Sequence, residues 1–323
     1  MKSLASVLRQ LFFALALLGG GTWSPAFVPI PEFSPVNDWL KVPADRPLTL
    51  KVSGVAVDST GRVYVAHRGP HPVMYFDQEG NYEGTLGEAE ITPSIFYDLS
   101  GSKPIPMERC PWVHGLHVDP WDNVWVTDVG RHIVMKFDRA GKLLLTLGTA
   151  DVPGESHRHF NQPTAVLVTT DGYIFVADGY GNSRIVKFDR NGNFLFAWGK
   201  RGTEPEDFHT PHALAIDTAG RLYVSDRENH RIKIHDQQGQ LLATWPNLYC
   251  VDAIFVHGDF LYGGVGPFSI IIKLDLRGRL LDTWGGPRQF GYPHGIALDG
   301  GGNLFVAEVA AGRVSKHRPK IIP

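Results

Sequence analysis

The stretch Pro211-His212-Ala213-Leu214-Ala215-Ile216-Asp217 recurs with variations along this chain of 323 residues. Each copy is a short apolar run that in most cases ends in aspartate, and the second, fourth and sixth of the six copies begin with histidine. The first positions of the copies, which we call the slots, are Ser53, His114, Thr164, His212, Asp252 and His294. They are separated by 61, 50, 48, 40 and 42 residues. Repeat periods of about 40 to 50 residues are typical of propeller blades.

Every repeat has the composition of four short strands. A turn such as Thr218-Ala219-Gly220 follows the slot strand, and a second strand, for example 221–225, comes next. A third strand such as 185–189 and a glycine turn lead to a fourth strand that ends in Leu-Gly or Trp-Gly, as at Trp198-Gly199. Units of four short alternating strands build propeller blades. The sequence therefore predicts an all-β fold, a six-bladed β-propeller of four-stranded blades.

The last repeat lacks its fourth strand, because the chain ends soon after the third, near Lys320. Residues around 36–42, upstream of the first repeat, are the natural supplier. An N-terminal strand that closes the last blade would join both ends of the ring and remove two exposed sheet edges. The longer intervals predict loops at about 88–112, 149–162 and 200–210, which we expect to rim one face.

Composition bounds the class of protein. A hydrophobic content of 43% describes a globular chain with a large core. The net charge of −2 gives no basis for a nucleic-acid or anionic-membrane partner. Residues 1–27 are typical of a signal peptide, with Lys2 and Arg9 ahead of the apolar run 11–18, although an uncleaved anchor is the alternative. We therefore expect a secreted or periplasmic monomer whose residues 28–323 form a single propeller domain.

The two cysteines of the chain, Cys110 and Cys250, fall in the second and fifth repeats. These repeats lie opposite each other in a six-membered ring, which disfavours a disulfide between them.

The alternation of histidines suggests a metal site. First strands of blades line the central channel, and alternate blades of six stand about 120° apart, so His114, His212 and His294 should converge. Three imidazoles with an open fourth position describe a catalytic zinc site. The alternative is that they are ordinary polar residues at strand starts. The remaining slots hold small or acidic residues that would leave room around an ion.

Residues just after the second strand of a blade share a face with the slot, because the first two strands are antiparallel. Arg68, Tyr180 and Arg227 occupy this row. The glycines around Tyr180 let its loop approach another group closely, whereas the two arginines could equally be surface residues that pair with neighbours. Three aspartates in the same row are interpreted as blade architecture, bonding loop amides through their side chains: Asp128, Asp178 and Asp226.

Four strings resemble the peptidyl-α-hydroxyglycine α-amidating lyases, which are six-bladed propellers of the NHL-repeat type. The strings are His-Gly-Leu-x-Val-Asp at 114–119, Asp-Gly-Tyr-x-Asn-Ser-Arg-Ile-Val at 178–186, Asp-Arg-Glu-Asn-x-Arg-Ile at 226–232 and Val-Ala-His-Arg-Gly at 65–69. The strings at 178–186 and 226–232 are the specific ones, and the resemblance covers about 50–318.

This resemblance implies a zinc lyase that splits a peptide ending in α-hydroxyglycine into a peptide amide and glyoxylate. A peptide or hydroxyglycine-type compound would be its substrate. It places the zinc on the three slot histidines, a catalytic tyrosine acting as general base at Tyr180, and active-site arginines at Arg68 and Arg227. Arg68 would hold the substrate carboxylate, and Arg227 would steady the phenolate or the leaving carbonyl.

The chain departs from the family at two positions beside the third histidine. Tyr292 stands where the family has methionine, and Gly295 where it has an aspartate that helps to hold a structural calcium ion. The glycine makes calcium binding doubtful. Two other functions remain open: a non-catalytic NHL-repeat propeller that binds a protein or peptide on its ring face, and a diverged propeller hydrolase or lactonase.

Overall fold

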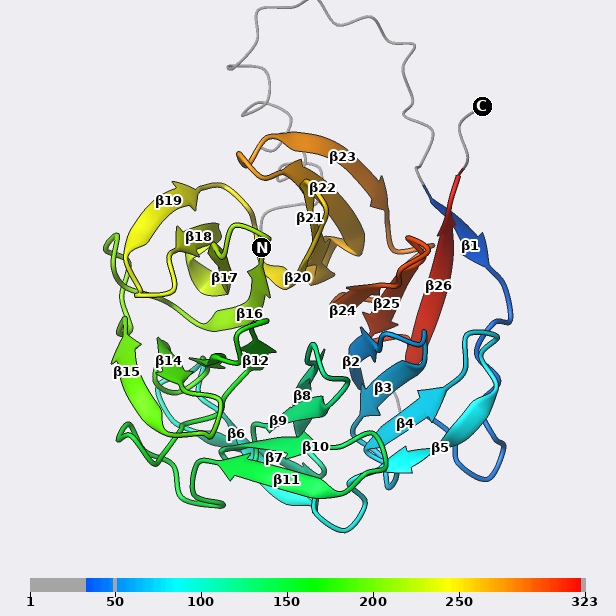
Figure 1. Ribbon diagram of the computed structural model, residues 1–323, viewed down its shortest axis with the longest axis horizontal. Helices are drawn as coiled ribbons and strands as arrows, with labels where there is room; N and C mark the ends of the chain where they lie inside the picture. Colours follow the sequence, from blue (N-terminus) through cyan, green and yellow to red (C-terminus); the bar gives the residue numbers. More distant parts are fainter. Residues whose placement is uncertain (1–32, 49–50, 321–323) are drawn as a thin grey trace, which may run out of the picture. The chain divides into compact units, whose positions relative to one another are not determined.

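A computed structural model of the chain describes residues 33–48 and 51–320. In this part of the chain, six four-stranded antiparallel sheets follow one another around a central channel (Figure 1). In each sheet, the strand that follows the slot position lies nearest the channel. The predicted six-bladed all-β propeller is confirmed. The predicted signal peptide, residues 1–27, lies outside the described residues.

Strands run consecutively within blades 1 to 5. Blade 1 contains β2 (Val52–Val57), β3 (Val63–His67), β4 (Val73–Phe76) and β5 (Tyr82–Leu86). Blade 2 contains β8 (Val113–Val118), β9 (Val124–Asp128), β10 (Ile133–Phe137) and β11 (Leu143–Leu147). Blade 3 contains β12 (Ala165–Val168), β13 (Ile174–Asp178), β14 (Arg184–Phe188) and β15 (Phe194–Trp198).

The second half of the ring repeats this order. Blade 4 contains β16 (Pro211–Ile216), β17 (Leu222–Asp226), β18 (Arg231–His235) and β19 (Leu241–Trp245). Blade 5 contains β20 (Val251–His257), β21 (Phe260–Val265), β22 (Ile270–Asp275) and β23 (Leu280–Gly285). Blade 6 contains β24 (Pro293–Leu298), β25 (Leu304–Glu308), β26 (Arg313–Pro319) and β1 (Phe33–Val36). Two 3₁₀ helices, η1 (Arg227–Asn229) and η2 (Gly266–Phe268), follow β17 and β21.

An N-terminal strand closes the last blade, as predicted, but its position differs. β1 pairs with β26 in a register that runs from Phe33 opposite Pro319 to Val36 opposite Lys316. The segment 37–42, which the prediction included, turns away toward blade 1, where the Trp39 indole donates to the carbonyl of Gln78. Its apolar residues pack against the core between blades 1 and 6, which explains their strand-like pattern, and its pairing is limited to an isolated bridge between Lys41 and Asn81.

Only one of the three predicted loops contains paired strands. Within 88–112, β6 (Ser94–Asp98) and β7 (Ile105–Cys110) form a two-stranded hairpin that belongs to no blade. The segments 149–162 and 200–210 contain no strand, only an isolated bridge between Arg201 and Phe208.

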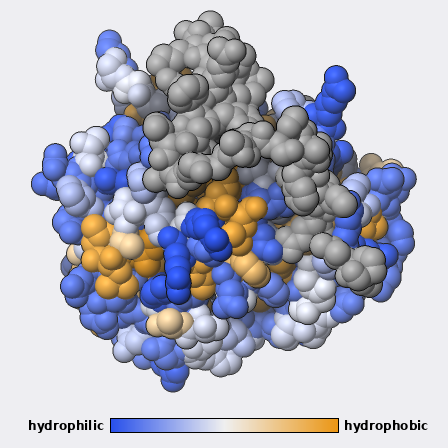
Figure 2. All heavy atoms as spheres, turned by 90° about the horizontal axis from the view of Figure 1, so that it is seen from above, coloured by the Kyte–Doolittle hydropathy of each residue, from blue (hydrophilic) through white to orange (hydrophobic). Residues whose placement is uncertain are grey.

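The hydrophobic core is divided into six clusters, one between each pair of neighbouring blades. Between blades 1 and 6, for example, Val65 and Phe76 pack with Phe305 and Val314. The surface in Figure 2 is mainly hydrophilic, with hydrophobic residues in separate patches. No helix among the described residues is long and apolar enough to cross a membrane. Cys110 and Cys250 are both free, in agreement with the expectation from their positions in the ring.

The turns between strands follow from an aspartate and a glycine. After β16, one carboxylate oxygen of Asp217 accepts hydrogen bonds from the amides of Ala219 and Arg221, at 3.0 and 2.9 Å. Gly220 adopts a φ of 77°, in the left-handed region that favours glycine. The recurring Asp-x-x-Gly pattern therefore builds the tight turns that keep consecutive strands adjacent.

A second acidic residue, at the end of the second strand, organises the rim of several blades. Asp178 and Asp226 each accept a backbone amide and pair with an arginine at the start of the next strand, Arg184 and Arg231 respectively. Asp128 accepts the amides of residues 130 and 131 but has an apolar residue at the arginine's register position. Its second carboxylate oxygen is buried without a hydrogen-bond partner. All three aspartates thus act in blade architecture, and one of them lacks its countercharge.

The unpaired carboxylate predicts a pH-dependent stability. Burial raises the pKa of Asp128 to about 6, against about 3.9 in an unfolded chain. The native state therefore binds the proton more tightly, and stability falls as the pH rises from about 4 to 6 and stays lower above. We expect Asp128→Asn to be more stable than the parent at pH 8 by roughly 3 kcal/mol. The difference should vanish near pH 4, and urea unfolding followed by circular dichroism measures it.

Asp226→Asn is the matched control. It leaves the partly buried Arg231 without its carboxylate, so it should lower the unfolding free energy at pH 8. An Asp128→Asn variant that loses stability at pH 8 as Asp226→Asn does would contradict this account of Asp128.

Candidate active site

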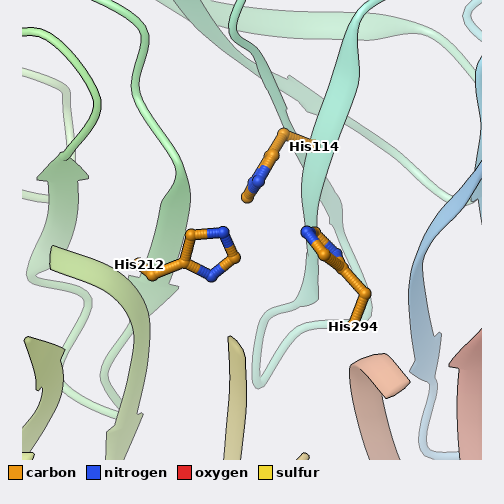
Figure 3. Close-up of side chains that lie close together, drawn as sticks. All are labelled: His114, His212 and His294. Atoms are coloured by element: carbon orange, nitrogen blue, oxygen red, sulfur yellow. The ribbon is translucent and has the colours of Figure 1, made fainter. Parts of the chain in front are cut away.

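Three histidine side chains converge at one mouth of the channel (Figure 3). His114, His212 and His294 lie at or next to the first residue of β8, β16 and β24, and their candidate ligand atoms all lie within 4.8 Å of one another. The ring centroids are 4.7 to 5.0 Å apart. The convergence expected from the repeat is confirmed. Among the described residues, these three histidines form the one cluster of side chains that could hold a metal ion.

Hydrogen bonds between blades fix the protonation of these rings. Each Nδ1 donates to the backbone carbonyl of the slot residue in the following blade. The acceptors are Thr164 for His114 at 2.7 Å, Asp252 for His212 at 2.7 Å and Ser53 for His294 at 2.8 Å. A neutral imidazole that donates from Nδ1 keeps its lone pair on Nε2. The lone pairs of the three Nε2 atoms are therefore the ones that could bind a metal ion.

The other slots extend the same ring. Ser53 donates from its hydroxyl to the carbonyl of Val113 at 2.8 Å, and Thr164 donates to the carbonyl of Pro211 at 2.6 Å. Asp252 breaks the series, since its carboxylate pairs with Arg227 and accepts the amide of Gly266 at 3.1 Å. Five slot side chains thus bond from blade to blade, whereas the Asp252 carboxylate is held by Arg227 and the amide of Gly266.

This donor set fits a divalent metal that prefers nitrogen ligands. Burial lowers the pKa of His294 to about 4 and holds those of His114 and His212 well below the ordinary value. Neutral rings are the form that binds metal, and an outer hydrogen bond from Nδ1 is the usual way in which proteins orient such ligands. Three histidines that leave one position open match zinc in a catalytic setting. The channel has a volume of about 330 Å³, and apart from the histidines it is lined largely by aliphatic side chains.

Tyr180 stands directly beside the donor atoms. Its hydroxyl lies 2.9 Å from Nε2 of His114 and 3.1 Å from Nε2 of His212. The predicted close approach of its loop is confirmed: a Cβ at Gly179 would lie 2.2 Å from the carbonyl oxygen of Pro211. Burial raises the pKa of Tyr180, and the positive charges of Arg227 and Arg68 oppose this shift without cancelling it. Ionisation of the phenol therefore needs a further positive charge nearby.

Arg68 reaches the same mouth from the end of β3. Its guanidinium carbon lies 4.3 Å from the centre of the Trp112 ring, a cation–π contact. Its Nε is buried without a hydrogen-bond partner, and within the described residues Arg68 forms no ion pair. Burial lowers its pKa, and Tyr180 opposes this effect. Arg68 is thus a positioned cation whose donors are available to an anion.

Arg227 is held differently. It pairs with Asp252 at 3.3 Å and with Glu228 at 2.8 Å. Its guanidinium carbon lies 5.5 Å from the centre of the Tyr180 ring. Burial alone would lower its pKa, but the charges of Tyr180, Asp252 and Glu228 outweigh burial and raise it. Arg227 therefore acts as a fixed positive charge against the phenol, and its own donors are largely used.

Two aromatic residues at the site escaped the sequence prediction. Phe96, on the hairpin, packs edge-on against Tyr180 with centroids 5.6 Å apart. The same ring lies 4.7 Å from Trp112, which supports Arg68. Trp112 occupies the place two residues before a slot, and that place could have been compared between repeats. The hairpin has no second copy in the chain and offered no such signal.

Gly295 has no side chain that could replace the calcium-binding aspartate expected at this position. A Cβ at this position would lie 3.0 Å from the Cα of Gly54 and 3.2 Å from the amide nitrogen of Val55. A carboxylate would therefore need the neighbouring backbone to move. Tyr292 adopts a φ of 65° and its ring lies against Gly266, next to the carboxylate of Asp252.

Comparisons with known proteins agree with this geometry. A family model described as NHL repeat matches residues 208–234. A probable peptidyl-α-hydroxyglycine α-amidating lyase of Caenorhabditis elegans is 32% identical over 294 residues, which are 83% of this chain and 82% of that protein. The peptidyl-glycine α-amidating monooxygenase A of Xenopus laevis is 34% identical over 297 residues, covering 83% of this chain and 32% of its own, so this chain spans about a third of its length. A gluconolactonase from Xanthomonas campestris superposes with a TM-score of 0.62 at 16% identity, over 85% of this chain and 90% of that one. This last likeness shows the fold alone.

The histidine cluster predicts metal binding that a single substitution abolishes. We expect the purified protein to contain about one divalent metal ion per chain, measured by inductively coupled plasma mass spectrometry after dialysis. His212→Ala removes one of three donors and should lose the ion. His117→Ala is the matched control, because His117 lines the same channel but its Nε2 accepts the amide of Val168. Equal metal content in the parent and His212→Ala would refute the site.

Proposed function

The chain belongs to the peptidyl-α-hydroxyglycine α-amidating lyase family, and we propose that it is a zinc-dependent lyase that splits a peptidyl-α-hydroxyglycine into a peptide amide and glyoxylate. The observation that carries the proposal is the placement of the Tyr180 hydroxyl within 3.1 Å of two of three converging Nε2 atoms. A propeller that only binds a partner on its ring face has no need of this arrangement.

The reaction breaks the bond between the amide nitrogen and the hydroxylated carbon. The hydroxyl loses its proton as the C–O bond becomes the carbonyl of glyoxylate, and the leaving nitrogen gains a proton to become the amide. The three histidines would hold zinc, which when bound supplies a Lewis acid for the substrate hydroxyl. Binding of the carboxylate and movement of the proton fall to side chains of the chain itself.

Arg68 is the group suited to the substrate carboxylate. It is a partly buried cation that pairs with no carboxylate in the described part of the chain, and its guanidinium packs on the Trp112 ring. A guanidinium grips a carboxylate with two parallel hydrogen bonds, which orients as well as binds. Binding the carboxylate here would present the hydroxylated carbon to Tyr180 and to the histidine cluster.

Tyr180 is the group suited to accept the hydroxyl proton. A phenol becomes a useful base at neutral pH only where positive charge favours the phenolate. Arg227 supplies such charge from 5.5 Å, and its pairing with Asp252 keeps it in place. A metal ion at the neighbouring Nε2 atoms would add the charge that Arg227 and Arg68 alone do not supply. Tyr180 can then return the proton to the leaving nitrogen.

The first test is release of glyoxylate from α-hydroxyhippurate, measured colorimetrically with the parent and with Tyr180→Phe. We expect kcat to fall by about 10²- to 10⁴-fold in Tyr180→Phe, the usual contribution of a general base. The metal content should stay unchanged. Tyr173→Phe, a phenol in the same blade away from the channel mouth, should keep the parent's activity. Unchanged turnover in Tyr180→Phe would remove this residue from the mechanism.

Substitution of the two arginines should change different kinetic parameters. Arg68→Gln removes the carboxylate contact and is expected to raise KM about 10- to 100-fold, the worth of a charged hydrogen-bonded pair. Arg227→Gln removes charge from beside Tyr180 and should chiefly lower kcat. Steady-state kinetics on α-hydroxyhippurate distinguish the two. If Arg227→Gln changed only KM, Arg227 would be a binding residue instead.

A further inference from the structure

The β6–β7 hairpin is an addition to the propeller that is built firmly onto its rim. The six blades close without it. The Gln162 side chain donates from Nε2 to the carbonyl of Tyr97 at 2.6 Å. The Trp112 indole donates to the carbonyl of Glu108 at 3.0 Å, and a Cβ on Gly130 would meet the Ser94 hydroxyl. A segment fixed at several points beside a candidate active site is suited to shape what binds there.

The hairpin continues into the site through Phe96. This ring contacts both Trp112, the support of Arg68, and Tyr180. Behind it, the amide of Tyr180 donates to the carbonyl of Gln162 at 3.3 Å. Gln162 is therefore shared between the loop of the tyrosine and the space under the hairpin.

That space is a groove of about 670 Å³ between the hairpin and the rim of blades 2 and 3. We call it the hairpin groove, and its lining includes Ser94, Ile95, Tyr97, His132, Asn161 and Gln162. Its volume falls within the range of sites that hold small ligands or short peptide segments.

Two polar atoms in the groove lining have no protein partner. Ser94 Oγ and Gln162 Oε1 are both buried without a hydrogen bond, and the side chains are 7% and 1% exposed. The orientation of the Gln162 amide is set, because its Nε2 must face the carbonyl of Tyr97. Buried polar atoms are nearly always paired in folded proteins. An acceptor and a hydroxyl left free in one groove match the N–H and C=O groups of a peptide backbone.

The hairpin also carries exposed apolar side chains. It contributes four of the twelve large hydrophobic residues that are exposed in the described part of the chain: Ile95, Tyr97, Ile105 and Met107. Two of these, Ile95 and Tyr97, line the groove. A groove with backbone-type hydrogen-bonding groups and apolar walls suits an extended peptide with a bulky apolar side chain.

We propose that the hairpin groove is a subsite for the peptide chain of the substrate, holding the residues that precede the hydroxyglycine. The inference rests on the proposed function. A substrate whose carboxylate meets Arg68 would extend past Tyr180 and Phe96 toward Gln162. There the peptide backbone pairs with Gln162 Oε1 and Ser94 Oγ, and an apolar side chain packs on Ile95 and Tyr97. The substrate class is thus a peptide of several residues with an apolar residue near its modified end.

Binding of two uncleavable ligands tests the subsite without requiring catalysis. Benzoylglycine and acetyl-Leu-Phe-Gly both offer a glycine carboxylate, but only the second has a peptide chain to place in the groove. In calorimetry with the full chain we expect the peptide to bind at least tenfold more tightly, which corresponds to about 1.4 kcal/mol. Ser94→Ala and Tyr97→Ala should each reduce this ratio severalfold and leave the affinity for benzoylglycine unchanged.

Both variants should fold, since the Ser94 hydroxyl makes no protein hydrogen bond and the Tyr97 side chain is exposed. Leu242→Ala, an exposed apolar residue on β19 of blade 4, is the matched control and should keep the ratio. Equal affinity of the parent for both ligands, or an unchanged ratio in both groove variants, would overturn the subsite. A ratio that depends on the hairpin in a protein that releases no glyoxylate would uphold the subsite and refute the lyase function.

Discussion

The hydrogen bonds that pass from blade to blade at the slots are the constraint on which the site depends. Each slot histidine donates a hydrogen bond from Nδ1 to a backbone carbonyl of the next blade. This one bond joins two sheets and also orients an unprotonated Nε2 toward the channel axis. The serine and threonine slots carry the ring onward through their hydroxyls. The spacing of the three donor atoms is therefore a property of the closed propeller, since no single blade can set it.

The charge balance of the channel mouth follows from this neutral triad. Arg227 is offset by Asp252 and Glu228, whereas Arg68 has no carboxylate partner among the described residues and rests on Trp112. Among the described residues, the mouth thus holds one positive charge without a carboxylate partner, in a partly buried setting where electrostatic attraction is stronger than in water. Arg68 could bind an anion, and the Tyr180 hydroxyl lies within 3.1 Å of two of the three Nε2 atoms. In the proposed mechanism, recognition of the carboxylate and support of the proton transfer fall to separate arginines.

Sequence periodicity predicted what repeats and missed what does not. The slots, the turns and the threefold histidines each occur several times, so comparison of copies revealed their places. The closing strand was predicted at 36–42 but lies at Phe33–Val36, because the apolar residues of 37–42 pack on the core between blades 1 and 6 without pairing. The β6–β7 hairpin, Phe96 and the free acceptor of Gln162 occur once, and only their spatial neighbours show what they do. The orientation of the Asp252 side chain likewise could not be predicted, because it depends on the ion pair with Arg227.

The closing strand carries one further implication, for how the ring can be connected to other protein. β1 and β26 are neighbours in blade 6, with Phe33 opposite Pro319, so the polypeptide enters and leaves the ring at a single corner. That corner lies on the outer strands of the blade, whereas the histidines belong to the innermost strands (Figure 1). A propeller joined in this way can be inserted into a longer polypeptide as a closed module, because both attachment points lie away from the channel mouth.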